Sequence, residues 1–137
     1  MKRILSLFLL LLTAFFLMGM GDLGGTPEGS VPAVDEDYHV QLTDREGVSV
    51  SLSQFSMDGN IVLQGKRGSG TMSIPFSALT AIEVTQTRSN DATVNLSLNE
   101  GESLQIKIPG RAVFYGSTGF GGYQIRVDDV TRIDFQP

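Results

Sequence analysis

The chain has 137 residues and a formal net charge of −5, with 41% hydrophobic residues and no cysteine. An acidic surface repels the phosphate backbone of nucleic acids and does not attract anionic lipids, so we expect no nucleic-acid partner. Without cysteine the protein has no disulfide, no thiolate nucleophile and no thiolate metal ligand.

The first 21 residues have the pattern of a secretory signal peptide. Lys2 and Arg3 form a positive start, residues 4–18 form an apolar run, and Gly19 and Gly21 are small residues suited to cleavage. The run is shorter than the roughly 20 residues that a membrane span needs, and a retained anchor is the alternative. Export without cysteine indicates a bacterial periplasmic or secreted protein, with no membrane span after cleavage.

Residues 22–37 are rich in glycine, proline and acid and have no periodicity, which predicts a flexible linker. This linker ends in three acidic residues, Asp35, Glu36 and Asp37. We interpret them as solvated, because three consecutive carboxylates cannot all face one cation without a shaped loop.

Residues 38–137 have the pattern of an all-β domain. Residues 48–53 alternate apolar residues with serine, which is typical of a half-buried strand. Asp58-Gly59 predicts a tight hairpin turn, because glycine accepts the positive φ that such a turn requires. Ser77, and Asp128 further along, are expected to cap single helical turns through their side-chain oxygens.

The second half of this domain repeats the spacing of the first. At an offset of about 51 the aligned residues are Ile74 and Ile125, Phe76 and Val127, Leu79 and Val130, and Ile82 and Ile133. Upstream the offset becomes about 54, and Val40, Leu42 and Leu52 align with Val94, Leu96 and Ile106. The sequence therefore predicts two tandem repeats, residues 38–85 and 92–137.

Each repeat is close to the size below which a core cannot offset chain entropy, so we expect the two to share one core. The predicted fold is all-β, with four to five antiparallel strands in each repeat. The strands would form one β-sandwich or partly closed barrel, and two small abutting barrels are the alternative.

The first repeat resembles the opening motif of the Sm-like small-barrel family. The resemblance covers about 25 residues: Val40-Gln41-Leu42, the turn at residues 44–47, then Leu52, Phe55, Asp58 and residues 60–63. It implies a small bent β-barrel geometry. Sm-like proteins bind RNA, but this chain is acidic and lacks the family's closing basic-glycine motif, so no RNA-binding residue is carried over. The repeated ending also resembles uncharacterised exported bacterial β-repeat proteins.

The sequence contains no pattern that indicates catalysis. His39 is the single histidine, and Val40 and Leu42 should face inward, so His39 should face outward or lie at a strand edge. No nucleophile or metal ligand is spaced to act with it. Asp128 and Asp129 could serve as paired carboxylates for hydrolysis, but the repeat explains Asp128 as a cap. We therefore expect no enzyme activity, no cofactor and no metal site; a hydrolase that uses His39 is the last-ranked hypothesis.

Two glycine-rich loops, residues 65–70 and 116–122, are the candidate binding surface, because loops on a rigid β scaffold commonly bind partners. The candidate residues are Lys66, Arg67, Arg111, Tyr115, Phe120 and Tyr123. The leading hypothesis is a non-catalytic exported domain that binds an envelope protein or a glycan through these paired loops. The alternative is an assembly protein that pairs through sheet edges, and the oligomeric state stays open.

Overall fold

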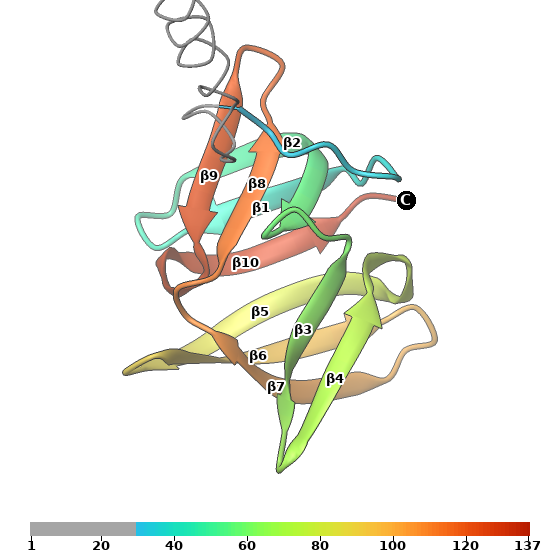
Figure 1. Ribbon diagram of the computed structural model, residues 1–137, viewed down its shortest axis with the longest axis vertical. Coiled ribbons are helices and arrows are strands. Elements are labelled where there is room, and N and C mark those ends of the chain that lie inside the picture. The colour runs from blue at the N-terminus through green and yellow to red at the C-terminus, as the bar shows by residue number, and fades with distance from the viewer. Residues whose placement is uncertain (1–29) are drawn as a thin grey trace, which may run out of the picture.

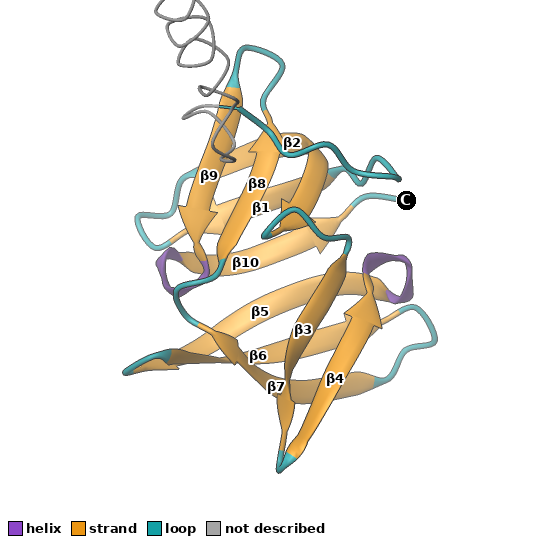
Figure 2. Cartoon of the chain, in the orientation of Figure 1, coloured by secondary structure: helices purple, strands orange, loops and turns teal. Residues whose placement is uncertain are grey.

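The computed structural model describes residues 30–137, so the predicted signal peptide lies outside the described residues. The ten strands are β1 (Val40–Asp44), β2 (Ser49–Met57), β3 (Val62–Arg67), β4 (Gly70–Pro75), β5 (Leu79–Arg88), β6 (Asp91–Leu98), β7 (Ser103–Pro109), β8 (Val113–Ser117), β9 (Gly122–Arg126) and β10 (Val130–Phe135). Two single 3-10 turns, η1 (Phe76–Ala78) and η2 (Val127–Asp129), precede β5 and β10 (Figure 2). The all-β prediction is confirmed.

All ten strands belong to one antiparallel sheet, which curls into a half-barrel (Figure 1). The strand order is β4-β3-β7-β6-β5-β10-β1-β2-β8-β9. The central contact joins β5 to β10, where Ile82 lies opposite Ile133. The sheet edges are formed by β4 and β9, so both edges are hairpin strands.

The turn at residues 57–60 forms as predicted. Met57 and Asn60 exchange two backbone hydrogen bonds of 2.8 and 2.9 Å, and Asp58 and Gly59 have φ values of 51° and 84°. The predicted hairpin between the flanking strands is wrong, however, because β2 pairs with β8 and β3 pairs with β7. The turn reverses the chain and sends β3 to a different part of the sheet.

Two glycines allow these long-range strand contacts. A Cβ atom on Gly65 would lie 2.6 Å from the backbone oxygen of Lys107 on β7. A Cβ atom on Gly116 would lie 2.8 Å from the Cβ atom of Leu52 on β2. Only glycine lets β3 and β8 approach their partner strands so closely.

The buried side chains of both halves form one cluster, in agreement with the expected shared core. Its aromatic part consists of Phe55 on β2, Phe76 on η1 and Phe114 on β8, and the partly buried Phe135 on β10 packs against it. The ring centroid of Phe55 lies 5.3 Å from that of Phe76 and 5.2 Å from that of Phe114, and both pairs are stacked. Such pairs add about 0.5–1.5 kcal/mol each beyond the area that they bury.

The capping roles predicted for Ser77 and Asp128 are wrong. Both residues lie inside their 3-10 turns, which begin after Pro75 and Arg126 without a side-chain cap. Backbone hydrogen bonds close the turns instead. The Asp128 carboxylate pairs with the Arg126 guanidinium at 2.7 Å, and the buried residue of each turn is its first.

The end of the predicted linker contacts the domain. The Asp37 carboxylate accepts a 2.6 Å hydrogen bond from the backbone N–H of Gln54, which has a φ of 51°. The Glu36 carboxylate accepts a 2.7 Å hydrogen bond from the Tyr38 hydroxyl. Two of the three acids at the end of the linker therefore have protein partners.

Candidate functional site

The two glycine-rich loops lie at opposite ends of the molecule. Figure 1 shows the β3–β4 hairpin at one end of the long axis and the β8–β9 hairpin at the other. The candidate residues therefore divide into two groups, with Lys66 and Arg67 at one end and Phe120 at the other. The expectation that the paired loops form one surface is wrong, because β3 and β8 join different ends of the sheet.

Phe120 is fully exposed at the tip of the β8–β9 hairpin. The backbone around it is ordered by Thr118. The backbone N–H and the hydroxyl of Thr118 each donate a 3.0 Å hydrogen bond to the carbonyl of Gly121. The Thr118 hydroxyl oxygen accepts hydrogen bonds of 3.2 Å from the N–H groups of Phe120 and Gly121. The phenyl ring is thus presented to solvent by a fixed turn.

The other aromatic candidates lie further down the same hairpin. Tyr115 on β8 is directly opposite Gln124 of β9, and Tyr123 packs against the core. Burial raises the pKa of the Tyr123 phenol, and the negative charge of Asp44 acts in the same direction. Arg111 is exposed on the connection between β7 and β8. None of these three residues belongs to the turn that presents Phe120.

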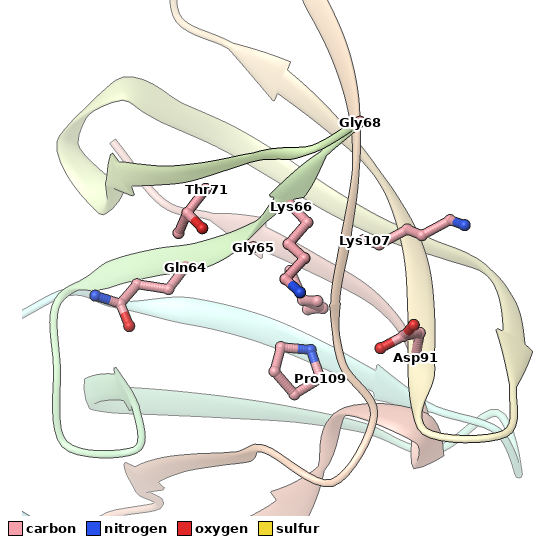
Figure 3. A pocket seen from close by; sticks show the side chains of 9 residues that line it. Gln64, Gly65, Lys66, Gly68, Thr71, Asp91, Lys107 and Pro109 are labelled. Atoms are coloured by element: carbon pink, nitrogen blue, oxygen red, sulfur yellow. The ribbon is translucent and has the colours of Figure 1, made fainter.

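A pocket of about 390 Å³ opens beside the other hairpin, at the contact between β3 and β7. Lys66 lies directly opposite Lys107 in the register of these two strands. Figure 3 shows the Lys66 side chain running toward Pro109, with the Asp91 carboxylate facing the same space. Gln64 and Thr71 supply neutral polar groups to the lining.

A second hollow of about 220 Å³ adjoins this pocket and shares Lys66 and Lys107. Arg67 also lines it. Within residues 30–137 none of these three cationic side chains forms an ion pair, whereas Arg126 and Arg132 each pair with a carboxylate. The region is therefore a basic surface on an acidic protein.

Lys107 lines both cavities, but the sequence did not identify it as a candidate binding residue. The glycine-rich loop drew attention to Lys66 and Arg67, which lie beside it. Lys107 is in a separate strand of ordinary alternating pattern, and it joins the site only because β3 pairs with β7. No local signal predicts that pairing.

His39 is exposed, as expected, and its Nε2 atom lies 3.3 Å from the Asp37 carboxylate. Within the described residues no group of three or more histidine, cysteine or acidic side chains is arranged to hold a metal ion. No helix in residues 30–137 is long and apolar enough to cross a membrane.

A family model with the description "Uncharacterised protein" matches residues 34–137, which include all ten strands. No curated protein matches the sequence.

Proposed function

This chain belongs to the family described as "Uncharacterised protein", and we propose that it is an exported, non-catalytic β domain that binds an envelope protein. The proposed location is the bacterial periplasm or the cell exterior. The proposed contact is the tip of the β8–β9 hairpin, with Phe120 as its anchor. The resemblance to Sm-like barrels supports a small bent β scaffold, and we carry no RNA-binding role over from it.

The exposure of Phe120 is the observation that carries this proposal. Among the large hydrophobic side chains of the described residues only Val48 and Phe120 are exposed. Val48 is 52% exposed, whereas Phe120 is fully exposed. Aromatic anchors that insert into a partner's pocket dominate the binding energy of many interfaces. The hydrogen bonds of Thr118 fix the turn beforehand, so little ordering entropy is lost on binding.

The test is site-specific crosslinking of the full chain in its own cell envelope, with the crosslinker at Gly121. We expect one dominant protein partner. Phe120→Ser should weaken its capture by about 30-fold, which corresponds to an anchor worth about 2 kcal/mol. Val48→Ser is the matched control, since it also removes an exposed apolar side chain, and it should leave capture unchanged. Equal capture by Phe120→Ser, or no captured protein, would contradict the proposal.

A second candidate function is assembly through sheet edges. The edge strand β9 is exposed at every second residue, and its outer backbone groups have no strand partner among the described residues. An edge of this kind can pair with another chain. This alternative predicts that Gln124→Pro changes the oligomeric state measured by light scattering, whereas Phe120→Ser does not.

A further inference from the structure

Two lysines lie opposite each other in the register of the β3–β7 contact. Lys66 and Lys107 form the single register pair between these strands. Like charges directly opposite each other destabilise a sheet. Gly65 brings the two strands closer together, because the absence of its Cβ atom allows β3 to lie against the backbone of Lys107. The strand contact therefore brings the Cα atoms of two cationic residues side by side, and Figure 3 shows the Lys107 side chain extending away from Lys66.

The charges around the pocket define the anion. Lys66, Lys107 and Asp91 line the pocket, and Arg67 lines only the adjoining hollow, which shares both lysines. Counted over the two cavities, the net charge of about +2 matches a phosphate monoester, which carries about −1.5 to −2 at neutral pH. Lysine ammonium groups bind phosphate as point charges, and the arginine fork can donate two parallel hydrogen bonds.

The size and lining of the pocket define the rest of the ligand. A volume of about 390 Å³ is within the range of small-molecule sites and exceeds what a phosphate group needs. The Thr71 hydroxyl, the Gln64 amide and the Asp91 carboxylate are hydrogen-bonding groups suited to sugar hydroxyls. Figure 3 shows Lys66 and Asp91 on either side of the open space.

We propose that the pocket between β3 and β7 binds a phosphate monoester carried on a small sugar. Lys66, Lys107 and Arg67 hold the phosphate at the adjoining hollow, and Asp91, Thr71 and Gln64 contact the sugar in the pocket. This site is independent of the Phe120 tip, which lies at the other end of the molecule (Figure 1).

The test is a titration of the full domain with inorganic phosphate and with glucose 6-phosphate at constant ionic strength, followed by NMR of the backbone amides. We expect saturable shifts at Gly65, Gly68 and Gly70 with both probes, and tighter binding of the sugar phosphate. Binding of inorganic phosphate with equal affinity would assign the site to free phosphate and overturn the sugar contacts. Shifts that do not saturate would overturn the site itself.

Charge variants decide which residues hold the anion. Lys66→Gln and Lys107→Gln should each weaken binding of glucose 6-phosphate about tenfold or more, since each removes a charge-assisted contact. Arg132→Gln is the control, because it removes the same charge from an exposed position on β10, outside both cavities. Equal losses in Lys107→Gln and Arg132→Gln would overturn the proposal.

The strand order carries a second, independent inference. If strands β1–β5 are renumbered β6–β10, and β6–β10 are renumbered β1–β5, the strand order becomes the same order read backwards. The register between β5 and β10 has the same symmetry. Subtracting 51 from Arg132 gives Ala81 and adding 51 to Glu83 gives Asp134, and these two residues also form a pair, with the pair Ile82 and Ile133 at the centre. The turns η1 and η2 and the close-contact glycines Gly65 and Gly116 differ by the same offset.

We infer that the domain consists of two repeats that exchange strands within one chain. One half of the sheet, β10-β1-β2-β8-β9, combines two strands of the first repeat with three of the second. The other half, β5-β6-β7-β3-β4, combines two strands of the second repeat with three of the first. Neither repeat can complete its own half of the sheet, so folding requires both.

The test places a protease site in the turn between Arg88 and Asp91 of the full chain and cleaves the folded protein. We expect the cut halves to stay associated and to refold with second-order kinetics, so that tenfold dilution slows refolding about tenfold. The uncut protein is the control, and its refolding rate should not depend on concentration. Two fragments that refold separately would overturn the exchange. If the cut protein does not refold, a concentration-independent melting midpoint of the native cut protein would overturn it.

Discussion

Ser56 is the one buried polar side chain of the core, and its hydroxyl has no hydrogen-bond partner within the described residues. A buried polar group without a partner loses its hydration and gains nothing in return. Ser56→Ala should therefore raise the free energy of unfolding by about 1 kcal/mol, measured by urea denaturation. Ser51→Ala, on the exposed face of the same strand, should change it by less than about 0.5 kcal/mol. A loss of stability in Ser56→Ala would contradict this reading.

Tyr123 makes the free energy of unfolding depend on pH in the alkaline range. Burial raises the pKa of its phenol above the usual 10.0, with a contribution from Asp44. In the unfolded chain the phenol ionises at its ordinary pKa, whereas the folded state disfavours the charged form. The stabilisation is therefore complete below pH 10 and is lost as pH rises through the raised pKa of the folded state.

Tyr123→Phe should remove this dependence, so its unfolding free energy should decline less steeply between about pH 9 and 11. Parallel urea titrations of both proteins across this range provide the measurement. The pKa of Tyr38 is also raised, first by its hydrogen bond to Glu36, and this second tyrosine keeps part of the slope in the variant. Identical slopes in the two proteins would assign the decline to other groups.

Individual residues were predictable where their position follows from local pattern. His39 faces solvent because its neighbours face inward, and Phe120 is exposed because it lies in a glycine-rich loop. Lys107 was not predictable, because its role depends on which distant strand lies beside it. The capping assignments of Ser77 and Asp128 were wrong, since backbone hydrogen bonds alone close a turn as short as three residues.

At the scale of elements, Gly65 makes the contact between β3 and β7 possible. Gly65→Ala would place a methyl group 2.6 Å from the Lys107 carbonyl oxygen, and two isoleucine side chains lie within 2.9 Å. Overpacking of this kind costs about 1–3 kcal/mol. The control is Gly121→Ala, where the added Cβ atom meets nothing within 4 Å. Chemical denaturation of both variants measures the difference, and equal stabilities would show that β3 can move away from β7 at no cost.

Elements were easier to predict than their partners. Alternation and glycine turns are short-range signals, and they place the strands and the turn at Asp58-Gly59 correctly. Pairing depends on long-range packing, and a tight turn does not ensure that the strands on either side pair with each other. The signal that was available in the sequence is the shared offset of Gly65 and Gly116, since two glycines at equivalent strand positions mark close backbone contacts.

At the scale of the whole molecule, strand β10 joins the two halves of the sheet. It pairs with β1 on one side and with β5 on the other, and it lies at the C-terminal end of the chain. Ile133 is fully buried, and Phe135 packs against Phe55 and Phe76. Full burial of the Ile133 side chain contributes about 1.5–3 kcal/mol and the partly buried Phe135 adds to it, a large part of the roughly 5–15 kcal/mol that stabilises a domain of this size.

Deletion of residues 133–137 should therefore prevent folding, because it removes this burial and separates β1 from β5. The expected result is an insoluble product or one without a cooperative thermal transition by circular dichroism. Deletion of Gln136 and Pro137 alone is the control. It removes one backbone hydrogen bond of 2.9 Å, from Gln136 to the carbonyl of His39, and should cost only about 1 kcal/mol. A soluble protein that lacks residues 133–137 and melts cooperatively would show that β1 and β5 can close the sheet without β10.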